Sequence, residues 1–401
     1  MNLLVLNCGS SSIKYQVLQM PDESLIIKGI IERIGEIDAI VEAKNAHHKI
    51  KEIMAVKSHT EGIEQVLQMI VRPEFKALES VNEIGAIGHR IVHGGEKFSA
   101  STELTDSAIK AVEENIPLAP LHNPANLKGI VACKQVLPKV PQIGVFDTAF
   151  HQGLPKYAYL YAIPNEYYEK YGIRRYGFHG TSHKYVAQRT AEMLGKPIED
   201  TRIVTAHLGN GASVTAVKGG RSIDTSMGFT PLEGLIMGTR SGDLDPAILC
   251  FLQKNEGMSS EDIDVLLNKR SGIIGLYGKS NDMRPIEDGY FEKKELETLI
   301  MTMYSYRLAK YIGSYMAVMG GIDALTYTAG VGENTPPLRY IIAEFMKGLG
   351  FGIDEELNLK VIRYGKEVDI SSEDATVKTF VIPTNEELAI ARDTYSLVTG
   401  V

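Results

Sequence analysis

Two arginines and two histidines, the latter able to donate hydrogen bonds whether neutral or cationic, stand beside glycines where the chain should turn or an element should begin. Arg90 lies in GHRIVHGGEKF (88–98), Arg240 lies in MGTRSGDLDP (237–246), and His179 and His207 adjoin glycines in HGTSH and HLGNG. An arginine near a helix end is more often a surface ion pair. A chain with a formal net charge of −8 must, however, gather cations locally to bind an anion. Because guanidinium and imidazole groups can donate to phosphoryl oxygens, the pattern favours an anion site.

Three Gly-rich segments each follow an apolar run that is typical of a buried strand. They are LNCGSSSIK (6–14), HLGNGAS (207–213) and AGVGENT (329–335). A turn rich in Gly and Ser can bring backbone N–H groups close to a ligand, although the first segment, taken alone, can also be an ordinary hairpin with a loose turn. The sequence contains neither G-x-x-x-x-G-K-[ST] nor G-x-G-x-x-G. Any phosphates are therefore expected at hairpin turns rather than at a strand-to-helix loop.

Two histidine pairs have the spacing of metal ligands on a helix. These are His89 with His93 and His179 with His183, but neither pair encloses the glutamate of an H-E-x-x-H zinc motif. A capping or packing role is the better interpretation of His93 and His183.

PTNEELAIARD (383–393) has the pattern of a helix start. Thr384 and Glu387 are spaced as a capping box, which would leave Glu386 free. A free carboxylate could hold Mg²⁺, which prefers oxygen ligands. Alternatively, Glu386 could simply stabilise the helix N-terminus.

The elements that must position these groups alternate between strands and helices, which predicts an α/β architecture. Strands are expected at 3–6, 13–18, 84–87, 142–146, 203–207, 213–217, 324–328 and 379–382. Helices are expected at 61–70, 123–137, 180–194, 246–254, 294–320, 338–347 and 386–398. Because Gly9 and Gly209 occupy similar hairpins half a chain length apart, two domains built on one plan are predicted.

The composition limits the class of protein. With 401 residues, 44% of them hydrophobic, the chain can bury a large core in two or three domains. The acidic balance argues against a nucleic-acid or membrane-surface partner. Three widely spaced cysteines predict reduced thiols and a cytoplasmic location, and the N-terminus lacks the features of a signal peptide. The helix at 294–320 carries Arg307 and Lys310, which suits a core or interface helix better than a membrane span.

Taken together and in order, NCGSSSIKY, GHRIVHGGE, HNPAN, FDTAFH, RYGFHGTSH, HLGNG, MGTRSGDLDP, GVGEN and PTNEELAIARD resemble the acetokinase family over nearly the whole chain. The resemblance implies the duplicated two-domain α/β fold of sugar kinases, actin and the heat-shock chaperone ATPases, with a central nucleotide cleft. It implies a first domain of 1–147 plus 386–401. The second domain, 148–385, would bind the nucleotide and form a homodimer interface.

The resemblance also assigns expected roles to residues. The catalytic residues would be Asp147, His179 and Arg240. Mg²⁺, or Mn²⁺ in its place, would lie at Asn7 and Glu386. The acetate site would comprise Arg90, Val92, Leu121, His122, Phe178 and Pro231, of which Val92, Leu121, Phe178 and Pro231 would wall the methyl group. The ATP site would comprise Lys14, His207, Leu208, Gly209, Asn210, Gly211, Asp282, Met283, Arg284, Gly330, Val331, Gly332, Glu333 and Asn334.

The implied reaction is reversible transfer of a phosphoryl group from ATP to acetate, giving ADP and acetyl phosphate by direct in-line transfer. A propionate or butyrate kinase of the same family is the nearest alternative. A nucleotide-switched binding module or a filament-forming relative is possible from the fold alone. A carboxylate clamp at Arg90 favours an enzyme, because a switch has no need of one.

Overall fold

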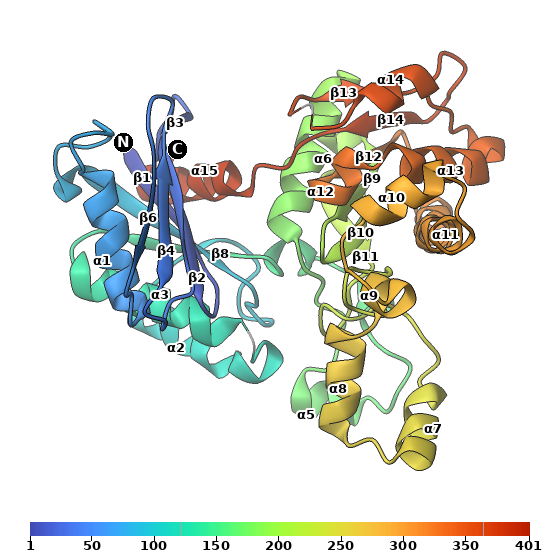
Figure 1. Cartoon of the computed structure of the whole chain (residues 1–401), viewed down its shortest axis with the longest axis horizontal. Helices are drawn as coiled ribbons and strands as arrows, with labels where there is room; N and C mark the ends of the chain where they lie inside the picture. Colours follow the sequence, from blue (N-terminus) through green and yellow to red (C-terminus); the bar gives the residue numbers. More distant parts are fainter. Residues whose placement is uncertain (121, 364) are drawn as a thin grey trace. The chain divides into compact units, whose positions relative to one another are not determined.

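The computed structural model describes residues 1–120, 122–363 and 365–401. It divides into two compact units, of which unit 1 is Met1–Gln152 with Asn385–Val401 and unit 2 is Gly153–Thr384 (Figure 1). The domain limits expected from the sequence, after 147 and before 386, fall near the limits of these units.

Unit 1 is built on an eight-stranded sheet with the order β5-β4-β3-β2-β1-β6-β8-β7. Strands β1 to β5 form an antiparallel meander, and β1, β6 and β8 are parallel neighbours. Parallel neighbours bring the carboxyl ends of β1, β6 and β8 to one edge of the sheet, where ligands usually bind in α/β proteins. The strands are β1 (Asn2–Cys8), β2 (Ser12–Gln19), β3 (Ser24–Glu32), β4 (Ala39–Lys44), β5 (Lys49–Met54), β6 (Ile84–Ile91), β7 (Thr102–Glu103) and β8 (Gln142–Phe146).

Helices cover both faces of this sheet, because alternate residues of its central strands are apolar on each side. Leu4, Leu6 and Cys8 share a core with α1 (His59–Ile70) and α3 (Asn123–Val136). On the opposite face, α15 (Glu386–Thr399) packs on β1 and β6. This packing requires Gly88, because a Cβ there would meet Thr394 Oγ1 at 2.5 Å. The C-terminal segment is thereby part of unit 1, and α2 (Asp106–Glu114) contacts α3.

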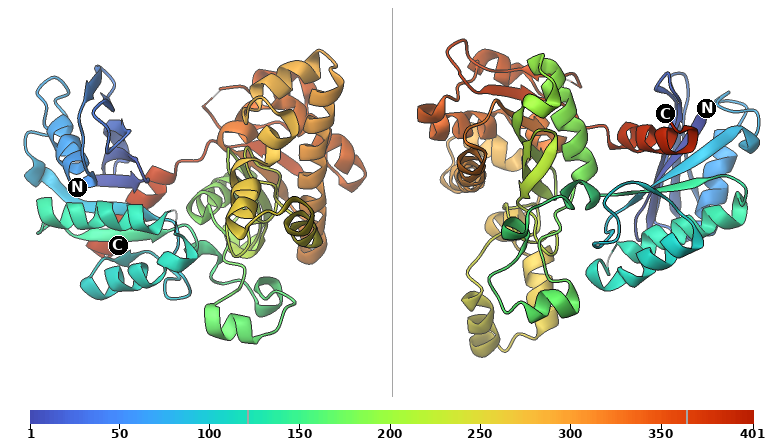
Figure 2. Two further views of the ribbon diagram at one scale, coloured as in Figure 1. Left: turned by 60° about the horizontal axis from the view of Figure 1, so that its bottom comes forward. Right: turned by 180° about the vertical axis from the view of Figure 1, so that it is seen from behind.

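Unit 2 is built on a six-stranded sheet with the order β11-β10-β9-β12-β14-β13. Its strands are β9 (Arg202–Leu208), β10 (Ala212–Lys218), β11 (Arg221–Thr225), β12 (Ala324–Thr328), β13 (Val368–Asp369) and β14 (Lys378–Val381). Figures 1 and 2 show α6 (Gly180–Leu194) on one face of this sheet and α11 (Glu295–Met319) on the other.

Shorter helices complete both units. In unit 2 they are α4 (Lys156–Tyr159), α5 (Glu166–Tyr171), α7 (Ala247–Glu256), α8 (Ser260–Lys269), α9 (Gly272–Tyr277), α10 (Arg284–Phe291), α12 (Ala329–Asn334), α13 (Pro336–Met346) and α14 (Glu355–Lys360). The 3₁₀ turns are Val81–Glu83, Ile116–Leu118, Ala149–His151, Ile198–Asp200 and Lys347–Leu349. Among the described residues, no helix has both the length and the apolar character needed to cross a bilayer.

The two sheets repeat one plan, which confirms the duplicated α/β fold. In each, an antiparallel β-meander is followed by two parallel strands, β6 and β8 in unit 1 and β12 and β14 in unit 2. A short antiparallel strand then closes each sheet. The Gly9 and Gly209 turns join the first two strands of their respective sheets, as the sequence echo predicted.

Candidate active site

An ion pair between Arg90 and Asp147 stands at the edge of unit 1 where parallel strands end. Arg90 lies on β6 and Asp147 follows β8, its neighbour in the sheet. Arg90 Nε donates to Asp147 Oδ1 at 3.1 Å and Nη2 donates to Oδ2 at 2.7 Å. Asp147 is 1% exposed. Although burial opposes the charge on Arg90, Asp147 and Glu386 outweigh it and raise the pKa of the guanidinium above its ordinary value.

This pairing restricts how Arg90 can hold a substrate. A guanidinium presents two edges for bidentate binding, and Asp147 occupies the edge made by Nε and Nη2. A substrate carboxylate would therefore have to bind through the outer edge, made by Nη1 and Nη2. The bidentate clamp stays a prediction, but the geometry specifies which donors it can use.

The start of α15 differs from the sequence prediction. Its N-cap is Asn385, whose Oδ1 accepts from the Leu388 N–H at 3.1 Å, so the predicted capping box of Thr384 and Glu387 is wrong. Thr384 Oγ1 accepts instead from Ser182 Oγ at 2.8 Å. Glu386 was expected to be a free carboxylate, but its Oε2 lies 3.6 Å from Arg90 Nε.

Two oxygen donors of unit 1 can be tested as metal ligands. Asn7 lies near the end of β1, whose parallel partner β6 carries Arg90, and Glu386 opens α15, which packs on both strands. Within 1–120, 122–363 and 365–401, no cluster of three His, Cys, Asp or Glu side chains could hold a metal alone. One amide and one carboxylate fit a hard divalent cation that takes its other ligands from water and substrate phosphates.

The other residues expected in unit 1 lie in different places. Val92 follows β6, and its N–H donates to Asn126 Oδ1 at 3.1 Å. His122 is the N-cap residue of α3. Lys14 lines a cavity of about 410 Å³ over β2, β3 and β4, together with Lys28 and other residues. Leu121 falls outside the described residues.

In unit 2, three histidines form a compact cluster at the start of α6 and the end of β9. The rings of His179 and His207 stack with centroids 4.2 Å apart. Ser213 Oγ is hydrogen-bonded to His179 Nδ1 at 2.9 Å and to His183 Nε2 at 2.7 Å. His183 Nδ1 is bonded to Thr205 Oγ1 at 2.7 Å. Both ring nitrogens of His183 are thus used within the cluster, in agreement with its predicted packing role.

Serines complete this cluster, although the sequence reasoning did not select them. Ser182 Oγ is bonded to His207 Nδ1 at 2.8 Å, and Ser213 orients His179. His179 is held in the left-handed region, with φ of 56°, a conformation that costs free energy and is typical of functional sites. Two sequence signals could have located these serines. Ser182 lies between the two histidines of HGTSH, and Ser213 ends the segment HLGNGAS.

Arg240 brings a positive charge to the same cluster. A Cβ built on Gly211 would lie 3.2 Å from Arg240 Nη1 and 3.7 Å from His179 Nε2, so both groups approach one turn. Arg240 Nη1 donates to the Pro231 carbonyl at 3.3 Å, and burial lowers the pKa of the guanidinium. Within the described parts of the chain, Arg240 has no carboxylate at ion-pair distance. A partly buried cation without a counter-ion is suited to binding an anion.

A cavity of about 850 Å³ opens beside the Gly209 turn of unit 2. It extends between that turn, the start of α10 and the short helix α12. Its lining includes eight residues expected to bind ATP: Gly209, Asn210, Asp282, Met283, Arg284, Gly330, Val331 and Asn334. A cavity of this size is typical of small-molecule and cofactor sites.

The third glycine-rich segment is not the hairpin turn that the sequence predicted. GVGEN lies in α12, a six-residue helix directly after β12, so this part of the cavity is a strand-to-helix connection. Arg339 holds the helix, because its fully buried guanidinium donates through Nη1 to the Gly332 carbonyl at 2.8 Å.

Leu208 is fully buried, and burial raises the pKa of Glu333. The apolar burial of Phe178, 2% exposed, suits the wall role expected of it.

Comparisons with known proteins all match this chain to acetokinases over nearly its whole length. The profile of the acetokinase family matches residues 2–392. The acetate kinase of Caldanaerobacter subterraneus subsp. tengcongensis is 54% identical over 403 residues, and that of Thermoanaerobacter pseudethanolicus is 55% identical over 405 residues; both alignments cover 100% of each chain.

Solved structures give the same result. The acetate kinase of Porphyromonas gingivalis superposes with a TM-score of 0.94 at 48% identity, covering 99% of both chains. A propionate kinase from Francisella tularensis subsp. tularensis superposes with a TM-score of 0.91 at 42% identity, covering 98% of this chain and 99% of its own.

Proposed function

Because the chain belongs to the acetokinase family, an ATP-dependent phosphotransferase family whose acceptor is acetate, we propose that its clustered cations carry out this transfer. The observation that carries the proposal is Arg240, which is partly buried beside His179 and the Gly211 turn and has no carboxylate partner among the residues that the structure describes. Acetate is already ionised near neutral pH, since carboxylic acids titrate near pH ~4. The reaction therefore needs no general base, and its main difficulty is the approach of two anions.

Arg90, Arg240 and His179 each reduce the repulsion between the two anions at a different point. Arg90 holds the acetate carboxylate through its outer edge, and Asp147 fixes the orientation of Arg90 from behind. Arg240 and His179 donate to the equatorial oxygens of the transferring phosphoryl group, where charge is spread in the transition state. The attacking acetate oxygen forms the new P–O bond as the bond to the ADP oxygen breaks, so acetyl phosphate and ADP are the products.

Different residues would bind the nucleotide and the metal. The cavity of about 850 Å³ in unit 2 receives ATP or ADP. The activity uses a divalent metal, and we assign it as Mg²⁺, with Mn²⁺ as a substitute, held by Asn7 and Glu386. When bound, the metal neutralises phosphate charge. The free thiols of Cys8, Cys133 and Cys250 support a cytoplasmic location.

The acyl specificity gives the first test. Val92 offers a branched side chain to a longer acyl group, so acetate should be preferred over propionate, and propionate over butyrate. One methylene changes specificity by about 10–200-fold, so propionate should be a slower substrate rather than an excluded one. Hydroxylamine trapping of the acyl phosphate, with ATP and each acid, measures kcat/KM for the series.

The similarity to a propionate kinase makes that activity the second candidate function. A kcat/KM for propionate equal to or above that for acetate would support it and overturn the preference for acetate. Val92→Ala serves as the matched variant, and it should raise the propionate value relative to acetate. No trapped acyl phosphate with any of the three acids would contradict the enzymatic assignment itself.

A homodimer through unit 2 is the expected assembly, and α11 supports it. Leu296, Leu299, Met303 and Tyr306 are exposed by 36–54% along this helix, at the 3-4-3 spacing of a helix-pairing seam. Phe345 extends the stripe by an edge-on contact with Tyr306. A second copy of the same helix suits such a face, because a two-fold axis pairs identical surfaces.

Charging this stripe should separate the protomers. Leu299→Glu places a carboxylate in the centre of the seam, so light scattering after size exclusion should give a mass near 44 kDa instead of twice that value. Ile37→Glu, at a position 88% exposed in unit 1, is the control and should stay dimeric. A monomeric wild type, or a dimeric Leu299→Glu, would show that the stripe is not the interface.

A further inference from the structure

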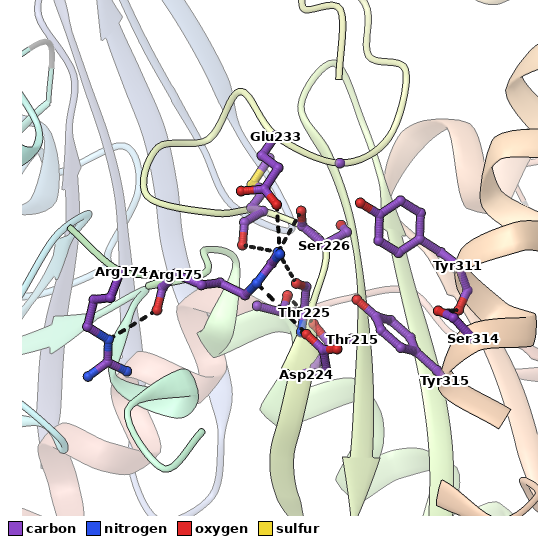
Figure 3. A network of polar contacts seen from close by, with 12 residues as sticks. Arg174, Arg175, Thr215, Asp224, Thr225, Ser226, Glu233, Tyr311, Ser314 and Tyr315 are labelled. Carbon is purple, nitrogen blue, oxygen red and sulfur yellow. Dashed lines mark hydrogen bonds and ion pairs between the residues drawn. The ribbon is translucent and has the colours of Figure 1, made fainter. Parts of the chain in front are cut away.

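Arg175 lies at the centre of a polar network beneath the loop that leads to Arg240 (Figure 3). Its Nη1 donates to the carbonyls of Thr225 at 2.7 Å and Ser226 at 3.2 Å, where β11 ends. Its Nη2 donates to Glu233 Oε1 at 2.7 Å. One guanidinium thus joins the end of β11 to the middle of the following loop, residues 226–240.

Glu233 is held from a second side. Tyr161 donates its hydroxyl to Glu233 Oε2 and accepts from the Phe229 N–H at 2.8 Å. The next residue, Gly234, has φ of 111° and would place a Cβ 2.6 Å from the Ser226 carbonyl. The loop therefore folds back on itself at a point that only glycine fits. Glu233 is one polar anchor of this turn, and the Gly234 N–H, which donates to Asp243 Oδ1 at 2.8 Å, is another.

Glu233 lies two residues after Pro231, whose carbonyl accepts from Arg240. The backbone around Arg240 is fixed elsewhere, since Gly238 N–H donates to the Asn210 carbonyl at 2.9 Å and Ile273 N–H donates to that of Met237 at 2.9 Å. These bonds do not direct the guanidinium. Its Nη1 donates to the Pro231 carbonyl at 3.3 Å and contacts Met237 Sδ at 3.7 Å. Of these two partners of Nη1, the Pro231 carbonyl is the one that belongs to the loop segment next to Glu233.

We propose that Arg175 and Glu233 are positioning residues, which hold Pro231 so that the guanidinium of Arg240 points at the transferring phosphoryl group. The inference rests on the proposed role of Arg240 and adds the residues through which it is aimed. Neither residue touches the reacting atoms. Because Pro231 is also expected to wall the acetate methyl group, the same pair should influence how acetate is held.

Arg175→Lys and Glu233→Gln test the proposal, because each keeps the approximate size while removing the forked pairing. A lysine cannot reach the β11 carbonyls and Glu233 together. A displacement of about 1 Å at a catalytic group can cost ~10²-fold in rate, so kcat should fall by that order while KM for ATP changes little. Glu233→Gln keeps the test open if Arg175→Lys does not fold.

A matched pair in the same unit controls for a merely structural role. Arg189 forms a bidentate ion pair with Glu367, with both hydrogen bonds at 2.7 Å, away from the loop. Arg189→Lys and Glu367→Gln should lower Tm by amounts comparable to the test variants yet keep kcat. If kcat falls equally in both pairs, the effect is general loosening of unit 2 and the proposal is overturned.

The deciding measurement is a double-mutant cycle with Arg240→Ala. If Arg175 acts through Arg240, then Arg175→Lys should have almost no further effect on kcat once Arg240 is alanine. Fold-losses that simply multiply would reject the positioning role while leaving the proposed role of Arg240 intact. An Arg240→Ala enzyme with nearly normal kcat would instead reject the role of Arg240 itself, so the two failures are distinguishable.

Discussion

Arg240→Ala should nearly abolish turnover while ATP still binds. An arginine that meets transition-state charge in phosphoryl transfer is worth ~10³–10⁵ in kcat. The large effect is expected because this guanidinium is partly buried and has no carboxylate partner within the described residues, so its charge is available to the phosphoryl group. In the proposed site, ATP would be held mainly by the cavity of about 850 Å³, whose lining does not include Arg240.

Steady-state kinetics in both directions, with calorimetric titration of ATP, separates these effects. Arg189→Ala is the control, because Arg189 is paired with Glu367. This variant should keep normal turnover. An Arg240→Ala enzyme that retained more than a tenth of the wild-type kcat would show that another group neutralises the phosphoryl charge. A parallel loss of ATP affinity would instead make Arg240 a ground-state ligand.

The elements were predictable because the apolar runs are long and clear. The run at 3–6 extends to β1 (Asn2–Cys8), and the predicted helix at 180–194 is α6 (Gly180–Leu194). The hairpins around Gly9 and Gly209 also followed from local sequence, because glycine between two apolar runs is a local turn signal. From these hairpins alone the sequence indicated duplication, which the matching strand orders confirm.

The features that the sequence did not predict correctly depend on contacts between residues that are far apart in the chain. Asn385 caps α15 in place of Thr384, because the Thr384 hydroxyl bonds to Ser182, a partner far away in sequence. GVGEN lies in a helix whose Gly332 carbonyl accepts from the buried Arg339, a residue outside the motif. Such contacts carry no local signal, so residues that aim others, among them Arg175 and Ser213, escaped the motif analysis. Resemblance to a family identifies groups that face ligands more readily than the residues that hold them.

The second large effect is expected at Arg90, where stability and activity should be lost together. Arg90→Ala removes two hydrogen bonds to Asp147, a carboxylate that is 1% exposed. Removing one partner of a buried ion pair costs ~3–5 kcal/mol, because the remaining charge is left without compensation. Hydrogen exchange of the β6 and β8 amides reports this loss locally. The kcat/KM for acetate should fall as well, since the outer edge of the guanidinium is gone.

A double variant separates the two losses. Arg90→Met with Asp147→Leu replaces the pair by apolar side chains of similar size, which is often neutral or stabilising by ~1–4 kcal/mol. Exchange protection of β6 and β8 should return towards wild type, whereas activity with acetate should not. If activity returned with stability, Arg90 would be a structural residue and the acetate carboxylate would bind elsewhere. If Arg90→Ala alone left the exchange rates unchanged, the pair with Asp147 would not stabilise this edge of the sheet.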